Sequence, residues 1–105
     1  MIKVAITVDE LTNKITQIEV KGHSNKSAYG HDLVCAAVSG ILVGGFNALN
    51  DKSVQMELKE GYALVSYNKL PSDSDAVVLK TIETQLMTIK ESEDKFINIE
   101  FFKKG

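Results

Sequence analysis

The 105-residue sequence contains one cysteine, one proline and no tryptophan. A single cysteine cannot form an intramolecular disulfide, so the sequence does not imply an oxidising compartment. It also shows no signal-peptide pattern and no apolar run long enough to span a membrane. We therefore expect a cytoplasmic protein with no membrane partner.

Basic residues are not in excess. Lysine and arginine together number 12 against 14 aspartates and glutamates, which gives a formal net charge of −2 and a pI of about 5.6. Binding to nucleic acid without sequence preference needs a basic surface that displaces counterions from phosphates. Direct binding to nucleic acid is therefore not expected, and an RNA-binding domain is a disfavoured alternative.

The length and composition fit one ordinary globular domain spanning residues 1–105. Hydrophobic residues make up 44% of the chain and charged residues 25%, which are average values for a folded domain. A domain of this size buries roughly 60–70% of the surface of its unfolded chain. One modest hydrophobic core is therefore expected, without help from disulfides or metals.

Alternating apolar and polar residues predict five strands. The first begins at Ile2, and the second covers residues 15–21 and ends at Gly22 and His23. A tight turn at Glu60 and Gly61 separates a third strand from a fourth, which covers residues 62–67. A fifth strand covers residues 96–102. Residues 24–31 have no usable periodicity and are predicted to form a loop.

Two helices are predicted between these strands. Asp32 is a favoured N-cap residue and precedes an apolar run over residues 33–49, which is apolar on most sides and therefore expected to be buried. Ser72, followed by Asp75, resembles a capping box that opens a second helix over residues 73–91. The order ββαββαβ predicts an α+β fold, with a single layer of mainly antiparallel sheet packed with two helices.

Cys35 is the candidate nucleophile. If Asp32 caps the helix, Cys35 lies in the first turn, where free N–H groups and the positive end of the dipole lower the pKa of a thiol. The same N–H groups could bind an oxyanion. The alternative is that Cys35 is a small packing residue among its apolar neighbours. The nearby carboxylate of Asp32 also opposes activation, because it raises the pKa of a thiol.

Two histidines could assist Cys35. His23 follows the second strand, twelve positions before Cys35, and a strand-loop-helix connection can bring the two ends together so that His23 acts as general base. The alternative for His23 is an ordinary surface histidine. His31 is a weaker candidate, because it lies just before the predicted helix and the sequence does not show whether its side chain is directed toward Cys35. A metal site built from these histidines with Asp32 and Cys35 is disfavoured, since the spacing matches no zinc pattern.

Two segments carry a family resemblance. They are Gly22-His23-Ser24 and Tyr29-Gly30-His31-Asp32-Leu33-Val34-Cys35-Ala36-Ala37-Val38-Ser39. Together they resemble the signature of the bacterial ribosomal-processing cysteine proteases, the Prp family. That signature has Gly-His, a short variable loop, and then Gly-x-Asp-hydrophobic-Val-Cys-Ala-Ala-Val-Ser. The match includes the loop length, and the element order of the whole chain resembles that of the family.

The resemblance implies a cysteine endopeptidase that needs no cofactor or metal. Its substrate would be the precursor of a large-subunit ribosomal protein, from which it removes an N-terminal extension. The catalytic dyad maps onto His23 and Cys35, and His31 falls on a variable position. Further motif positions, expected to support the site or bind substrate, are Gly22, Gly30, Asp32 and Ser39.

The resemblance also implies a homodimer. The apolar first helix fits this expectation, because Gly40, Gly44 and Gly45 would let another backbone approach it closely. The alternative function from another class is a non-catalytic, ribosome-associated binding module, in which Cys35 serves only in packing.

Overall fold

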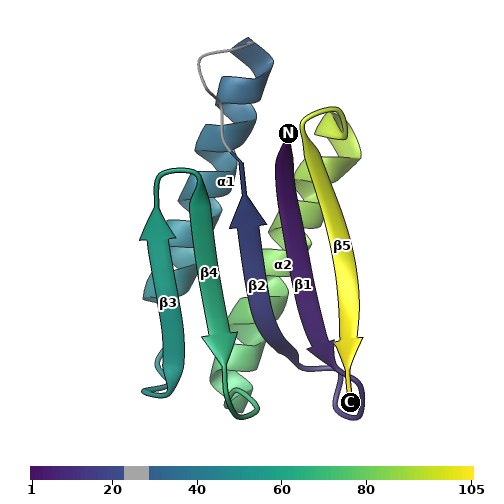
Figure 1. The fold of residues 1–105 in the computed structure, drawn as a ribbon. Coiled ribbons are helices and arrows are strands. Elements are labelled where there is room, and N and C mark those ends of the chain that lie inside the picture. The colour runs from purple at the N-terminus through teal and green to yellow at the C-terminus, as the bar shows by residue number, and fades with distance from the viewer. Residues whose placement is uncertain (23–28) are drawn as a thin grey trace.

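A computed structural model describes residues 1–22 and 29–105, with residues 29–32 described as backbone only. The elements in order are β1 (Ile2–Asp9), β2 (Ile15–Lys21), α1 (Tyr29–Asn47), β3 (Val54–Lys59), β4 (Tyr62–Tyr67), α2 (Asp73–Glu93) and β5 (Ile97–Lys104), shown in Figure 1. The strands form one sheet in the order β3-β4-β2-β1-β5, in which only β1 and β5 are parallel neighbours. The predicted α+β architecture is confirmed.

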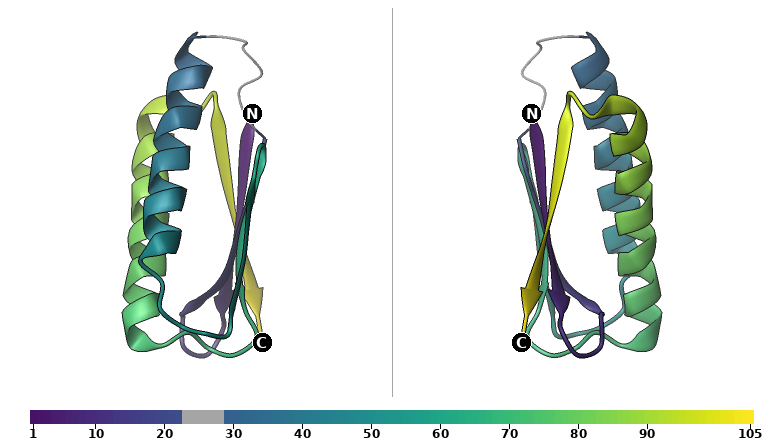
Figure 2. Two further views of the ribbon diagram at one scale, coloured as in Figure 1. Left: turned by 90° about the vertical axis from the view of Figure 1, so that its left-hand side faces the viewer. Right: turned by 90° about the vertical axis from the view of Figure 1, so that its right-hand side faces the viewer.

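Both helices cover the same face of the sheet, so the molecule has two layers (Figure 2). Cross-strand neighbours share a face, and the row Val4, Val20 and Ala63 is buried beneath the helices. Leu79, Ile82 and Leu86 of α2 complete this core from the helix side. The alternation in the sequence thus predicts correctly which residues of the strands face inward.

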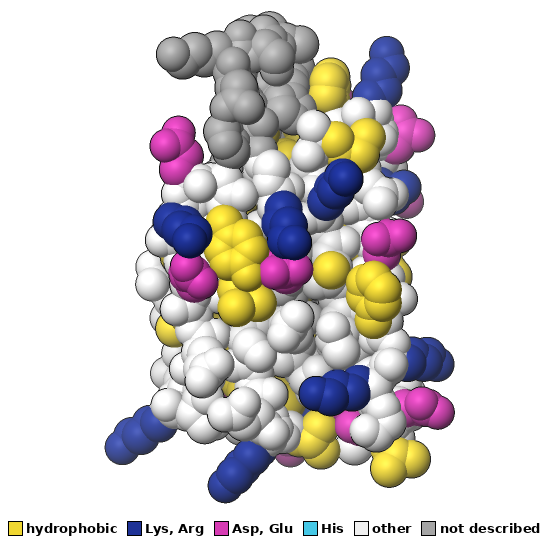
Figure 3. Space-filling view, viewed as in Figure 1, with side chains coloured by type: hydrophobic (Ala, Val, Ile, Leu, Met, Phe, Trp, Pro, Cys, Tyr) yellow, Lys and Arg dark blue, Asp and Glu magenta, His cyan; other side chains and the backbone are white. Residues whose placement is uncertain are grey.

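The other face of the sheet is open to solvent and carries lysines and acidic residues (Figure 3). Lys59 Nζ lies 3.0 Å from Glu57 Oε2 and 5.5 Å from the centroid of the Tyr62 ring. The Tyr62 hydroxyl donates a 2.7 Å hydrogen bond to Glu19, which raises the pKa of Tyr62 to about 12. A face with this chemistry is stable in water without a covering layer.

Helix α1 departs from its prediction because it is buried along one stripe only. Val34, Val38, Leu42 and Phe46 face the core, whereas Val43 and several small residues are exposed. A helix that lies on one face of a two-layer fold meets the sheet on one side only, so its apolar residues on other sides remain at the surface. No helix of the described residues has the length and apolar character needed to cross a membrane.

One glycine of α1, Gly45, has a different role from the predicted one. A Cβ at Gly45 would lie 2.5 Å from Ile82 Cδ1, so this glycine makes room for a side chain of α2 and not for another backbone. At Gly40 and Gly44 a Cβ would face open space.

Asp75 is fully buried in the first turn of α2 and joins three parts of the chain. Its carboxylate accepts hydrogen bonds from the backbone N–H groups of Asn50 and Asp51, at 2.8 and 3.1 Å, and from the Tyr67 hydroxyl at 2.8 Å. Burial, and then this hydrogen bond to Asp75, raise the pKa of Tyr67 well above its ordinary value. We call Asp75 with its three donors the Asp75 clamp.

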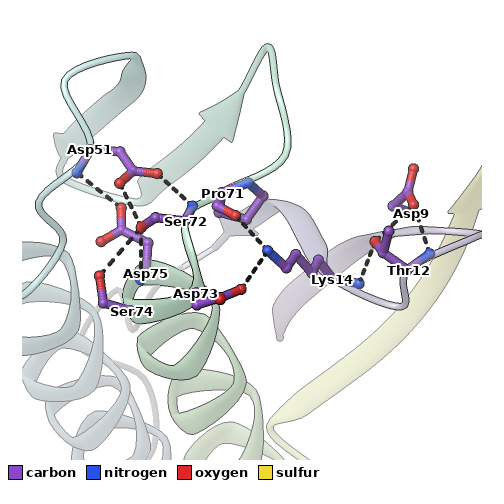
Figure 4. Close-up of polar contacts among 9 residues, drawn as sticks. All are labelled: Asp9, Thr12, Lys14, Asp51, Pro71, Ser72, Asp73, Ser74 and Asp75. Carbon is purple, nitrogen blue, oxygen red and sulfur yellow. Dashed lines mark hydrogen bonds and ion pairs between the residues drawn. The ribbon is translucent and has the colours of Figure 1, made fainter.

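The predicted capping box is half correct. Ser72 Oγ accepts from the Asp75 N–H at 3.2 Å, as the prediction requires. The second hydrogen bond of a capping box would run from the Ser72 N–H to the Asp75 side chain. The Ser72 N–H instead donates to Asp51 Oδ2 at 2.9 Å (Figure 4). Hydrogen bonds from Ser72 hold the pKa of Asp51 below its usual value. Beside them, Lys14 Nζ binds the Pro71 carbonyl oxygen and Asp73 (Figure 4).

Candidate active site

Helix α1 begins earlier than the sequence predicts. It starts at Tyr29, so Asp32 is its fourth residue and not its N-cap, and the predicted loop 24–31 is wrong over residues 29–31. Extending an existing helix needs no new nucleus, and an acidic residue in the first turn suits the helix dipole. Local capping preference therefore did not decide where α1 begins.

Cys35 consequently lies in the second turn of α1 and not in the first. The N–H groups left unbonded by a helix belong to its first four residues, and the influence of the dipole falls off within the first turn. The prediction that the first turn supplies both the nucleophile and the oxyanion donors is therefore wrong. The helix end therefore contributes little to any activation of Cys35.

Cys35 lines a cleft between α1 and the sheet. The cleft has a volume of about 310 Å³ and opens at the surface. The Cys35 side chain is half-buried and packs against the edge of the core. Residues from five elements and two connecting segments line the cleft: Ile2, Val20, Gly22, Cys35, Val38, Ser39, Leu42, Val43, Leu58, Lys59, Gly61, Tyr62 and Ala63.

Gly22 places the end of β2 at this cleft. Its φ angle is +96°, in the region that favours glycine, and a Cβ there would lie 2.4 Å from the carbonyl oxygen of Met1. Its N–H donates a 3.0 Å hydrogen bond to the Gly61 carbonyl, which ties it to the turn between β3 and β4. Any side chain here would disturb the path of the chain just before His23.

The structure brings three of the predicted site residues together. Cys35, Ser39 and Gly22 line one cleft, with Ser39 one helical turn after Cys35. Gly30 and Asp32 lie in the first turn of α1, where only the backbone is described. His23, the predicted general base, lies outside the described residues. Among the side chains that are described, no group of three or more His, Cys, Asp or Glu residues could hold a metal ion.

Sequence reasoning missed the far wall of the cleft. Leu58, Gly61 and Ala63 come from β3, β4 and their turn, more than 20 residues after Cys35. Their strand pattern and the turn at Gly61 were predicted, but nothing local indicates that this hairpin faces Cys35. That juxtaposition arises from the strand order, which places β4 beside β2.

Comparison with known proteins identifies the family of this chain. The family model described as cysteine protease Prp matches residues 1–98. The ribosomal processing cysteine protease Prp of Staphylococcus aureus, found in two strains, is 29% identical over 96% of this chain and 99% of the relative.

Solved structures give the same result. The S. aureus protease with a covalently linked product peptide has a TM-score of 0.83 at 30% identity, and that with a substrate peptide has 0.81 at 27%. Each comparison covers 96% of this chain and 99% of the other. A Streptococcus mutans protein at 21% identity shares the fold, with a TM-score of 0.83. The family match over nearly the whole chain, on a fold that places the sole cysteine in an open cleft, shows that this chain belongs to the Prp family of cysteine proteases.

Proposed function

We propose that this protease removes the N-terminal extension of a large-subunit ribosomal protein in the cytoplasm and so supports ribosome assembly. The observation that carries the proposal is that Cys35 and Gly22, the residue directly before His23, line the same cleft. The relatives are named for ribosomal processing, and two of their structures hold a substrate or product peptide. In this proposal residues 1–105, with all seven helices and strands, form one catalytic domain.

In the proposed mechanism, Cys35 and His23 form a catalytic dyad. His23 takes the proton of the Cys35 thiol, and the thiolate attacks the scissile carbonyl carbon. As the peptide bond breaks, His23 returns the proton to the leaving amine, and an acyl group stays on Cys35. Water then hydrolyses this thioester. Ser39 and Gly22 support the site, Ser39 from the next turn of α1 and Gly22 from the end of β2.

The dyad predicts the reactivity of Cys35 toward iodoacetamide. At about pH 6 an ordinary thiol, with a pKa of about 8.5, is almost entirely protonated and reacts slowly. A Cys35 thiolate paired with the His23 imidazolium should react at least about tenfold faster in the folded protein than in the same protein unfolded in urea. Because Cys35 lies outside the first helical turn, His23→Ala should remove most of this advantage. Mass spectrometry of the alkylated protein measures both rates.

His31→Ala is the matched control, since it removes the only other histidine of the chain. We expect this variant to react like the wild type. If His31→Ala slowed the reaction and His23→Ala did not, the general base would be misassigned. If folded and unfolded proteins reacted equally, Cys35 would not be activated, and the non-catalytic binding module would be favoured.

We also propose that the protein is a homodimer that joins through the exposed side of α1. This side carries Ala37, Gly40 and Gly44, and it borders a groove of about 330 Å³ against α2. Small residues on an apolar helix allow a second helix to approach closely. The family resemblance supports the same state.

Gly44→Glu tests the dimer. A side chain at Gly44 meets open space in the single chain, and replacing a helical glycine favours the helix, so the monomer should fold normally. We expect sedimentation equilibrium to show a dimer for the wild type and a monomer for Gly44→Glu. Leu11→Glu, at an exposed apolar position between β1 and β2 and outside this groove, is the control. A monomeric wild type, or a variant that dimerises equally well, would contradict the proposal.

A further inference from the structure

Three lysines and one tyrosine form a row across the outer face of the sheet. Lys3 of β1 pairs directly with Lys21 of β2. The row continues on the next two strands with Tyr62 of β4 and Lys59 of β3. Directly paired residues share a face, and neighbouring strands lie about 4.8 Å apart, so the row is about 14 Å long. We call these four residues the lysine row.

The pairing of Lys3 with Lys21 opposes the stability of the sheet. Like charges directly opposite each other on neighbouring strands repel, which is destabilising. Lys3 forms no ion pair with the residues that the structure describes, and Lys21 Nζ lies 3.9 Å from Glu19 Oε1, a long distance for an ion pair. Conflicts of this kind between sequence and stability are typical of functional surfaces, and two facing lysines favour an anionic partner.

An acidic row lies beside the lysine row and confines an anion to it. By the same register, Glu57, Glu19 and Glu100 lie two residues further along the sheet, about 7 Å away. Lysines and acidic residues are accordingly close neighbours on this face (Figure 3). The pair between Lys59 Nζ and Glu57 Oε2, at 3.0 Å, is exposed and therefore weak, so a bound anion can replace Glu57. A polyanion can thus follow the lysine row but cannot spread across the sheet.

Tyr62 places an aromatic ring between Lys21 and Lys59. Its hydroxyl donates a 2.7 Å hydrogen bond to Glu19, which orients the ring, and Lys59 Nζ lies 5.5 Å from the ring centroid. Surfaces that bind single-stranded nucleic acid combine basic side chains, which contact phosphates, with aromatic rings, on which bases stack. An open sheet face that carries such rings is a common scaffold for binding single-stranded RNA.

The strands beneath the row favour RNA over an acidic peptide. β1, β2 and β4 each have a neighbouring strand on both sides, so a peptide that crosses them finds no free strand edge. Extended peptides gain much of their affinity from main-chain hydrogen bonds at such an edge. RNA carries a charge on every nucleotide of its backbone and needs no edge. The net charge of −2 opposes binding elsewhere on the surface, so the contact is expected to be weak and limited to the row.

We propose that the lysine row binds single-stranded RNA, with Lys3, Lys21 and Lys59 contacting phosphates and Tyr62 stacking on a base. The inference goes beyond the proposed function, because it concerns the outer face of the sheet and a partner that is not cleaved. It replaces the expectation, drawn from net charge alone, that the chain does not contact nucleic acid directly. RNA binding is measured without any cleavage, so the two proposals stand or fall separately.

Fluorescence anisotropy with a labelled single-stranded RNA of about twelve nucleotides tests the phosphate contacts. We expect a Kd on the order of 10⁻⁴ M at about 50 mM salt, with log Kd rising with log salt at a slope of about 2 for three contacts. Lys3→Gln/Lys21→Gln should raise Kd at least about tenfold and lower the slope to about 0.7. Lys52→Gln/Lys69→Gln is the matched control, since it also removes two exposed lysines, at the other end of β3 and β4, and should change Kd less than about twofold.

Tyr62 distinguishes RNA from other anions. Tyr62→Leu should raise Kd about fivefold or more, whereas Tyr62→Phe, which keeps the ring, should change it less than about twofold. The proposal is overturned if the protein does not bind the RNA, or if the two double-lysine variants bind it equally well. It is also overturned if a glutamate-rich peptide of the same charge competes as well as unlabelled RNA and Tyr62→Leu has no effect, because the row would then bind acidic peptides.

Urea unfolding tests the argument from repulsion. Lys3→Gln removes the charge opposite Lys21 and should raise the midpoint of unfolding, whereas Lys52→Gln should leave it almost unchanged. A lower midpoint for Lys3→Gln would give Lys3 a role in stability and would remove the reason for assigning the row to a partner.

Discussion

Alanine in place of Cys35 is expected to lower kcat/KM for processing of the ribosomal precursor by about 10⁴-fold or more. The reaction forms a covalent bond between the substrate acyl group and Sγ, and alanine offers no atom that can form it. The chain has no second cysteine that could take over. His23 alone could activate only a water molecule, which is a much poorer route.

A loss of activity in Cys35→Ala can be attributed to the chemistry, because the substitution should not disturb the fold. Cys35 is half-buried at the edge of the core, so removing its sulfur should leave the fold and the melting temperature almost unchanged. Precursor and enzyme are incubated, and the new N-terminus is followed by mass spectrometry. Ser92→Ala, at an exposed position of α2 outside the cleft, should process the precursor at the wild-type rate. Equal processing by Cys35→Ala and the wild type would remove Cys35 from the mechanism.

Asp75→Ala should cause the largest loss of stability, about 3–5 kcal/mol in the free energy of unfolding. The carboxylate is fully buried and accepts from Asn50, Asp51 and Tyr67. Alanine would leave these three donors without their acceptor, the Tyr67 hydroxyl at a buried site and the two backbone N–H groups at partly buried ones. Domains are typically stable by only about 5–15 kcal/mol, so the variant should unfold at markedly lower urea concentration.

Two variants show whether this loss comes from the Asp75 clamp. Asp73→Ala removes a carboxylate from the same helical turn, but this one is exposed and pairs only with Lys14, so about 1 kcal/mol or less is expected. Tyr67→Phe removes one of the three donors and should cost about 1–2 kcal/mol. If Asp75→Ala were no more destabilising than Asp73→Ala, the clamp would contribute little to stability.

The Asp75 clamp also predicts that the stability of the fold decreases at alkaline pH. The pKa of Tyr67 is higher in the folded protein than in the unfolded chain, where it is about 10. Its contribution to stability is therefore fully present below pH 10 and is lost as the pH rises above that value. Tyr67→Phe should accordingly lose less stability than the wild type between about pH 10 and 11. Equal losses would show that Tyr67 does not ionise with unfolding.

Most of the fold follows from local sequence. The alternation around Ile18 and Val20, the Glu60-Gly61 turn and the Ser72 cap predict the bounds of β2, β4 and the start of α2 as observed. These features depend on interactions between residues close in sequence, which is why they are readable without a structure.

Two kinds of feature could not be predicted: the extension of a helix beyond a favoured cap residue, and contacts between segments distant in the sequence. The start of α1 at Tyr29 overrode the capping preference of Asp32, and a stripe of apolar residues was left at the surface because only one side of α1 meets the sheet. The motif identified Cys35, but its cleft depends on Leu58 and Ala63, which reach it only through the order of the strands. The walls of the cleft therefore include residues that no local pattern connects to Cys35.

The parallel pairing of β1 with β5 affects how the molecule assembles. Eight register pairs, from Ile2 with Ile97 to Asp9 with Lys104, join segments separated by almost the whole sequence. Closing so long a loop costs chain entropy before these contacts form, and folds rich in distant contacts fold more slowly than local ones. The β1-β2 hairpin and the β3-β4 hairpin can form early, whereas β5 can add to the sheet only after α2 has crossed over it. A newly made chain would thus acquire the walls of its cleft before its last strand is secured.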